Sequence, residues 1–190
     1  MITKTRKTKE TDITLSLKLY GSGKSKIDTG VGFLDHMLES FSKHSLIDLD
    51  IKCIGDTHID DHHSVEDIGI VLGIALAQAL YPVQNMERFG SANIVMDEAC
   101  VSSDLDLSNR PFIVYETTLN GKVGSFDTEL VEEFFRAFVL NARLSCHIVQ
   151  VRGTNQHHII EAAFKAVAVA IRRACIYNER VGIPSTKDVL

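Results

Sequence analysis

The stretch that decides how this fold is interpreted is Asp60-Asp61-His62-His63-Ser64-Val65-Glu66-Asp67, because its pattern returns at Asn155-Gln156-His157-His158-Ile159-Ile160-Glu161-Ala162. Each copy holds two adjacent histidines and a glutamate at the same offset. On a helix the glutamate stands four residues after the first histidine and three after the second, so all three share one face of one turn. A single copy is equally consistent with a solvated helix start. Two copies, which use four of the eight histidines in the chain, favour metal binding.

The two copies lie 95 positions apart, which indicates a tandem duplication. Alternating apolar residues predict strands, and apolar residues at helical spacing predict helices, in the order strand, strand, helix, strand, helix in each half. Pro82 ends the second helix. The first half is predicted to contain strands over 13–19, 24–29 and 47–53 and helices over 33–44 and 62–81. The second half is predicted to contain strands over 92–96, 100–107, 111–117 and 146–152 and helices over 128–144 and 157–176.

Strands clustered ahead of each helix predict an α+β fold, with a mixed or antiparallel sheet and two helices on one face in each half. The halves, about 1–84 and 85–190, are expected to be related by a pseudo-twofold axis. The segment between them, Val83 to Glu87, is too short to serve as a linker. We therefore expect a single compact domain over residues 1–190.

Composition limits the functional class. A chain of 190 residues that is 45% hydrophobic and 24% charged is long enough to bury a core. Its net charge of -5 argues against a general nucleic-acid binder. No apolar run suits a membrane span, and no signal-peptide core follows Met1, so we expect a cytoplasmic protein without a membrane partner. The four cysteines are scattered through apolar segments and are expected to be buried, reduced thiols.

The type of ligand narrows the choice of metal. Imidazole and carboxylate donors without thiolate fit Mn²⁺, Fe²⁺ or Zn²⁺, and the carboxylates favour Mn²⁺, although zinc stays open on affinity grounds. Adjacent helical residues point about 100 degrees apart, so the two histidines of a pair are expected to serve different ions. Asp60, Asp61 and Asp67 flank the first pair and are expected to orient imidazoles, as is Glu98.

Four segments together resemble the imidazoleglycerol-phosphate dehydratase family, over about Arg6 to Leu190. They are Gly32-Phe33-Leu34-Asp35-His36-Met37-Leu38, Asp61-His62-His63-Ser64-Val65-Glu66-Asp67, Arg110-Pro111 and His157-His158-Ile159-Ile160-Glu161-Ala162-Ala163-Phe164-Lys165-Ala166. The resemblance implies a ribosomal-protein-S5-domain-2-like fold and dehydration of D-erythro-imidazole glycerol phosphate to imidazole acetol phosphate in histidine biosynthesis. It also implies two Mn²⁺ ions per active site and a homo-oligomer of about 24 subunits whose sites are shared between neighbours.

The family's metal ligands carry over to matching positions of this chain. Those are His36, His62, His63, Glu66, His157, His158 and Glu161. The chain departs from the family at Glu133, where many members have histidine. A carboxylate suits Mn²⁺ as well as imidazole does, so Glu133 is expected to coordinate directly or through water; the alternative is a solvated helix residue.

The resemblance also implies substrate contacts. Glu10 is expected to act as the acid or base, with His44 at the pocket edge, and His36, His62, His63, Glu66 and His157 are expected to face the substrate as well. Metal binding to the ring nitrogens would favour the imidazolate and help to expel hydroxide. The expected phosphate contacts are Arg88, Arg110, Lys165, Ser185, Thr186 and Lys187. Asn109 and Asp188 stand where the family commonly has glycine.

Two other functions remain open at this point. A dinuclear metallohydrolase would use the ions to activate water on a phosphate ester and would release inorganic phosphate. A non-catalytic, metal-stabilised shell or storage assembly would need the ligands but not the phosphate-binding residues. The products formed from the substrate distinguish all three.

Overall fold

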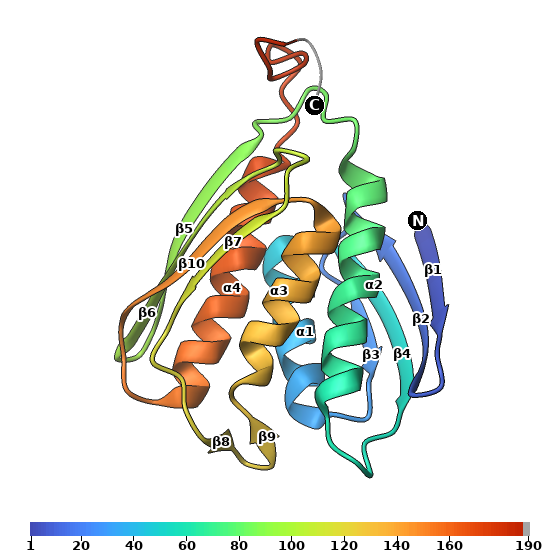
Figure 1. Cartoon of the computed structure of the whole chain (residues 1–190). Helices are drawn as coiled ribbons and strands as arrows, with labels where there is room; N and C mark the ends of the chain where they lie inside the picture. Colours follow the sequence, from blue (N-terminus) through green and yellow to red (C-terminus); the bar gives the residue numbers. More distant parts are fainter. Residues whose placement is uncertain (188–190) are drawn as a thin grey trace.

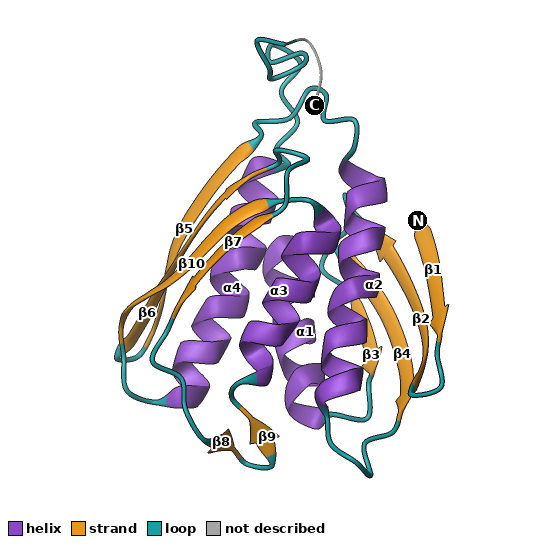
Figure 2. Ribbon diagram, viewed as in Figure 1, coloured by secondary structure: helices purple, strands orange, loops and turns teal. Residues whose placement is uncertain are grey.

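The computed structural model describes residues 1–187 and shows a layer of helices flanked by two four-stranded sheets (Figure 1). Figure 2 shows the helices standing together between the sheets. The first half comprises β1 (Ile2–Lys7), β2 (Thr11–Lys18), β3 (Ser25–Asp28), α1 (Gly32–Ser45), β4 (Asp48–Gly55) and α2 (His62–Leu80). The second comprises β5 (Phe89–Met96), β6 (Ala99–Asp106), β7 (Phe112–Glu116), β8 (Lys122–Val123), β9 (Phe126–Asp127), α3 (Leu130–Ala142), β10 (Ser145–Arg152) and α4 (Gln156–Ala174).

The two sheets have the same topology. The strand orders are β1-β2-β4-β3 and β5-β6-β10-β7. In each sheet the first two pairings are antiparallel and the last is parallel. The register is repeated as well, because Leu17 faces Leu49 in the first sheet and Leu105 faces Cys146 in the second. The predicted α+β class, with one unit used twice, is confirmed.

The predicted order of elements lacked several strands. Three strands, not two, precede the first helix of the first half, because β1 was not predicted, and five strands, β5 to β9, precede the first helix of the second half. Along β1 the residues alternate between half-buried and exposed, and the half-buried ones include Lys4 and Arg6, so the strand shows no apolar alternation. The β8–β9 hairpin was also missed, because two-residue strands are too short to show a period.

Glycines bring α2 and α3 into close contact. A Cβ atom added at Gly69 would lie 2.8 Å from the Phe134 carbonyl oxygen, and one at Gly73 would lie 2.5 Å from that of Phe138. The core continues to α4, where the Phe164 ring lies 5.0 Å from that of Phe134, centroid to centroid. By length and composition α2 is apolar enough to cross a membrane, contrary to the expectation that no apolar run suits a membrane span, but 67% of that window is buried inside the protein.

All four helices begin at the same end of the molecule, the lower end in Figure 1. Their N-terminal turns carry unpaired backbone N–H groups and partial positive charge. Both histidine pairs lie in such turns, at the start of α2 and of α4. The duplication therefore brings the predicted ligands to one end of the helical layer.

Candidate metal cluster and anion pocket

The structure brings three predicted ligands, His36, His157 and Glu161, into one cluster. One ligand atom from each lies within 4.8 Å of the others. Glu161 Oε2 is 3.2 Å from His157 Nε2 and 3.7 Å from His36 Nε2. The residues come from the start of α1 and the start of α4, so helix packing rather than a loop sets the distances.

Local sequence explains where α4 begins. The Asn155 side chain accepts a hydrogen bond of 3.3 Å from the His158 amide and so caps the helix. The cap places His157 in the first turn and Glu161 one turn later. Phe33 packs edge-on against the His157 ring, with centroids 5.2 Å apart. The His157 imidazole therefore packs against the Phe33 ring and also contacts the Glu161 carboxylate.

Charge around Glu161 keeps it ionised. Burial raises the pKa of this carboxyl, but Lys165, with Nζ 2.7 Å from Oε1, and the two histidines more than offset that effect, so the pKa lies below its usual value. Lys165 holds one carboxylate oxygen, and the other faces the imidazoles. Two imidazole nitrogens and one carboxylate oxygen form a donor set that fits Mn²⁺, Fe²⁺ or Zn²⁺.

The second histidine of this pair has different neighbours. His158 Nδ1 lies 2.7 Å from Glu98 Oε2, and its Nε2 lies 3.7 Å from Asp97 Oδ2. The hydrogen bond raises the pKa of His158 and lowers that of Glu98 to about 2. His157 and His158 thus face separate groups, and the predicted contact of Glu98 with an imidazole is present.

The first histidine pair shows the same division. His63 Nδ1 lies 3.0 Å from Asp56 Oδ2, which raises the His63 pKa, and its Nε2 lies 3.8 Å from Glu10 Oε1. His62 faces an acidic cavity of about 510 Å³. That cavity is lined by Gly30, Thr57, Ile59, Asp60, Asp61, His62, Lys122, Ser125, Asp127, Glu129 and Leu130.

Glu133 occupies the pseudo-twofold position of His36. Each stands ten residues before the left-handed residue that ends its helix, Leu46 after α1 and Arg143 after α3. Glu133 and Glu66 are both half-buried. Among residues 1–187, however, only the set of His36 with His157 and Glu161 converges. The equivalent set of Glu133 with His62 and Glu66 does not form such a cluster.

Two predictions about orienting carboxylates need correction. Asp67 does not contact an imidazole; it accepts hydrogen bonds from Arg6 Nε at 2.9 Å and from the Thr11 hydroxyl. Asp60 accepts from the backbone amide of His62, not from a ring.

The orienting group that sequence analysis missed is Asp56. It follows Gly55, at which an added Cβ would lie 2.0 Å from the Ser64 hydroxyl oxygen. The close approach of β4 and α2 at this glycine brings Asp56 to His63. In the sequence, only the Gly55-Asp56 dipeptide could have indicated this contact, and the same dipeptide is equally typical of the end of a strand.

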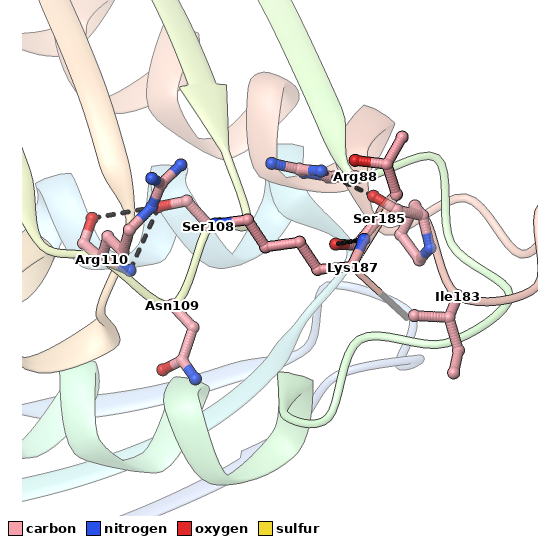
Figure 3. A pocket seen from close by; sticks show the side chains of 9 residues that line it. Arg88, Ser108, Asn109, Arg110, Ile183, Ser185 and Lys187 are labelled. Atoms are coloured by element: carbon pink, nitrogen blue, oxygen red, sulfur yellow. Dashed lines mark hydrogen bonds between the residues drawn. The ribbon is translucent and has the colours of Figure 1, made fainter. Parts of the chain in front are cut away.

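The predicted phosphate-binding residues line an anion pocket, a cavity of about 620 Å³ (Figure 3). Its lining residues are Arg88, Ser108, Asn109, Arg110, Ile183, Pro184, Ser185, Thr186 and Lys187. In Figure 3 the Lys187 side chain extends from the C-terminal segment toward the turn that carries Ser108 and Arg110. The pocket brings together all of the predicted phosphate contacts except Lys165, which is paired with Glu161.

Within this pocket, some of the N–H donors of Arg88 already bond other groups of the protein. Its Nε and NH2 groups donate to Asp106 at 2.7 and 2.9 Å, and its NH1 group donates to the Pro184 carbonyl at 2.6 Å. These bonds use three of its five N–H donors and leave two. Arg88 therefore fixes the C-terminal segment as well as contributing charge. Asp188, the second departure from the family pattern, lies outside the described residues.

The anion pocket and the metal cluster lie at opposite ends of α4. The Arg88 amide donates to the carbonyl of Ala174, the last residue of α4, whereas Glu161 lies near its start. At about 1.5 Å per residue the separation along the helix is about 20 Å. Glu10 lies with His63 at the cluster end. The four residues expected to meet in one pocket (Glu10, Arg88, Arg110 and Lys165) therefore do not meet within one chain.

His44 lies beyond the metal cluster along α1, near Lys165. It is eight residues after His36 on α1, about 12 Å along the helix. Its backbone carbonyl accepts a bond of 3.0 Å from Arg172. Burial and the neighbouring charges of Lys165 and Arg172 lower its pKa.

Comparison with known proteins gives a consistent result. Residues 29–171 match the sequence model of the family described as imidazoleglycerol-phosphate dehydratase. The chain is 82% identical to the imidazoleglycerol-phosphate dehydratase of Sulfurimonas denitrificans and 64% identical to that of a Sulfurovum species, each over 100% of both chains.

Comparison with solved structures points to the same family. The chain is similar to the crystal structure of imidazoleglycerol-phosphate dehydratase from Staphylococcus aureus, with 45% identity and a TM-score of 0.83 over 93% of this chain and 98% of that one. It is also similar to the IGPD of Pyrococcus furiosus solved in complex with (S)-C348, with 39% identity and a TM-score of 0.85 over 98% of this chain and 100% of that one.

Proposed function

The chain belongs to the imidazoleglycerol-phosphate dehydratase family, hydro-lyases of histidine biosynthesis, and from this premise we propose that it converts D-erythro-imidazole glycerol phosphate to imidazole acetol phosphate with Mn²⁺ as cofactor. The observation that carries the proposal is the convergence of His36, His157 and Glu161 on one point. A non-catalytic, metal-stabilised shell would not need phosphate-binding residues. This chain has such residues, and they line a pocket separate from the metal cluster.

The anion pocket suits the phosphate of the substrate. Arg88, Arg110 and Lys187 bring three positive charges to it, and Asp106 offsets one of them. The remaining charge matches a phosphate monoester dianion. Guanidinium groups supply paired donors to phosphate oxygens, and the lysine adds a point charge. The Ser185 and Thr186 hydroxyls lie in the same lining.

The ligands fall into groups that would hold two ions. We assign His36, His157 and Glu161 to one group, and propose that His62, His63, Glu66, Glu133 and His158 supply the remaining donors. Asp56 and Glu98 orient His63 and His158 through Nδ1, which leaves each Nε2 for the metal. When bound, Mn²⁺ supplies Lewis acidity that stabilises negative charge on the imidazole ring of the substrate.

Glu10 is the proposed acid or base. The reaction removes hydroxide from the carbon attached to the ring and a proton from the neighbouring carbon, and the resulting enol becomes a ketone. Glu10 stands at the tip of the β1–β2 hairpin, with Oε1 3.8 Å from His63 Nε2. A carboxylate at that place can take the carbon-bound proton and return it in the tautomerisation.

The separation of the two sites supports self-association. The substrate spans roughly five bonds of about 1.5 Å between ring and phosphorus, or roughly 7 Å. It cannot reach across the approximately 20 Å of α4 that separates Glu161 from the anion pocket of the same chain. We therefore propose that the phosphate pocket of one subunit completes the metal site of another, in a homo-oligomer of about 24 subunits.

A product assay tests the proposed function. Purified protein is analysed for metal and then supplied with imidazole glycerol phosphate, with and without added Mn²⁺. We expect a new ketone, retained phosphate and a rate that depends on Mn²⁺. Release of inorganic phosphate would point instead to a metallohydrolase, and no substrate-dependent rate would leave a metal-stabilised shell.

A further inference from the structure

Tyr81 links the ends of two helices to the anion pocket. It is the residue that follows α2, and its hydroxyl donates a hydrogen bond of 2.7 Å to the carbonyl of Arg143, which ends α3. The same hydroxyl accepts a bond of 3.1 Å from the backbone amide of Asn109 in the pocket lining. The Arg143 guanidinium lies 4.7 Å above the Tyr81 ring, so the ring is fixed as well.

The turn bound by this hydroxyl contains a left-handed residue. Asn109 has a φ of 55°, a region that asparagine tolerates better than most residues but that only glycine adopts without steric cost. A hydrogen bond to the Asn109 amide adds to the preference of the turn for this conformation. The Tyr81 hydroxyl accepts that bond.

The residues on either side of Asn109 are tied down in turn. The Ser108 hydroxyl donates to the Arg110 carbonyl at 3.0 Å, and the Arg110 amide donates to the Ser108 hydroxyl oxygen at 3.2 Å. Ser145, at the start of β10, also donates to the Arg110 carbonyl at 3.0 Å. These bonds hold Ser108 and Arg110 to the start of β10, and the Tyr81 hydroxyl holds Asn109 between them.

We propose that the Tyr81 hydroxyl is a positioning group that sets the affinity of the anion pocket, by fixing the Asn109 amide and with it the direction of Arg110. Tyr81 does not line the pocket, and its hydroxyl bonds the Asn109 amide of the turn. The identification of the anion as the phosphate of the substrate rests on the proposed function. The positional role does not, because inorganic phosphate probes the same pocket.

The test compares two tyrosine-to-phenylalanine variants in the assembled protein. Tyr81→Phe removes the hydroxyl bond to the turn. Tyr20→Phe is the matched control, because its hydroxyl also donates to a backbone carbonyl, that of Cys175 at 3.1 Å, but lies outside the pocket. Inorganic phosphate binding is measured by calorimetry, and KM and kcat are measured with imidazole glycerol phosphate.

We expect Tyr81→Phe to weaken phosphate binding about three- to tenfold, the effect of one lost hydrogen bond, and to raise KM by a similar factor with kcat within about twofold. Tyr20→Phe leaves both unchanged. Adding Asn109→Gly to Tyr81→Phe recovers part of the binding, because glycine carries no steric cost in the left-handed conformation. Unchanged phosphate affinity in Tyr81→Phe, or a loss in kcat alone, overturns the proposal.

A second variant covers the case in which Tyr81→Phe does not fold. Asn109→Ala keeps both helix ends intact and raises the cost of the left-handed turn. It is expected to weaken phosphate binding as well, and unchanged binding counts against the proposal. Phosphate affinity that follows these predictions in a protein without dehydratase activity would contradict the proposed function and leave the role of Tyr81 standing.

Discussion

Glu10 and Glu98 occupy equivalent positions in the two halves and have different neighbours. Each directly precedes the second strand of its sheet, β2 or β6. Glu98 holds the Nδ1 atom of His158, whereas in the first half Asp56 holds that atom of His63. Glu10 is thereby left on the Nε2 side of His63, at 3.8 Å. The two halves thus carry equivalent carboxylates, and because Asp56 holds Nδ1 of His63, Glu10 is the one that we propose to contact the substrate.

Glu10→Gln tests this division. The variant keeps the shape of the side chain but removes the base, so turnover is expected to fall about 100-fold or more while metal content and assembly size stay unchanged. Activity, metal analysis and sedimentation together measure the three quantities. Near-normal kcat in Glu10→Gln would remove this residue from the mechanism.

The orienting carboxylates predict a different phenotype. Asp56→Ala and Glu98→Ala each leave one imidazole without its Nδ1 partner. Metal affinity is expected to fall about 10- to 100-fold in both, measured by competition with a chelator. Asp60→Ala is the control, because Asp60 bonds a backbone amide of the same segment and no ring. Equal losses in all three variants would assign the effect to general charge.

At the residue scale, sequence reasoning located side chains whose role follows from helical spacing. Helical spacing alone places the first histidine of a pair beside the glutamate four residues later, as His157 lies beside Glu161. Asp56, Asp106 and Tyr81 were not found, because their partners depend on how strands, turns and helix ends meet in space. No pattern within one element records such contacts.

At the element scale, the contact between α2 and α3 depends on two glycines. The positions 95 residues after Gly69 and Gly73 are Phe164 and Ala168 in α4, so the second half has no equivalent of this close contact. Phe164 instead packs against Phe134 and Phe135. Alternating and helical periods predicted most elements, but they could not show which helix pair would approach closely, since that depends on residues that lack a side chain.

Gly73→Ala is expected to destabilise the protein. The added methyl group would lie 2.5 Å from the Phe138 carbonyl oxygen and 2.8 Å from the Asn141 Cβ atom. Overpacking of this kind lowers the free energy of unfolding by about 1–3 kcal/mol, which exceeds the gain of about 1 kcal/mol from better helix propensity. Thermal unfolding measures the change against Gln78→Ala, an exposed position of the same helix. A more stable Gly73→Ala would show that α2 and α3 can move apart.

At the scale of the whole molecule, the four parallel helices separate two kinds of chemistry. Imidazoles and carboxylates gather where the helices begin, and the arginine-lined pocket lies where α4 ends (Figure 1). The sequence motifs predicted both sets of residues. They could not predict the separation between them, because it follows from the common direction of the helices.

Metal removal is expected to reduce the size of the assembly. If ions bind at sites shared between subunits, their binding energy stabilises the contacts between subunits. Sedimentation after treatment with a chelator is therefore expected to show smaller species, and re-addition of Mn²⁺ should restore the large one. An unchanged profile in a protein shown to be free of metal would mean that the subunit contacts do not depend on the ions.

The shared site also predicts complementation between two inactive variants. Glu10→Gln impairs the metal end of a chain, and Arg110→Ala impairs the anion pocket. In a randomly mixed assembly, the metal end of a site comes from the Arg110→Ala chain, in which it is intact, with a probability of one half. The anion pocket of that site comes from the Glu10→Gln chain, in which it is intact, with the same probability. About one quarter of the sites should then be intact, since 1/2 × 1/2 = 1/4. Co-expression of the two chains is accordingly expected to give about one quarter of the unmodified activity, well above either variant alone. If ring and phosphate were instead bound by one chain, every site in the mixture would carry a defect, and activity would remain at the level of the separate variants.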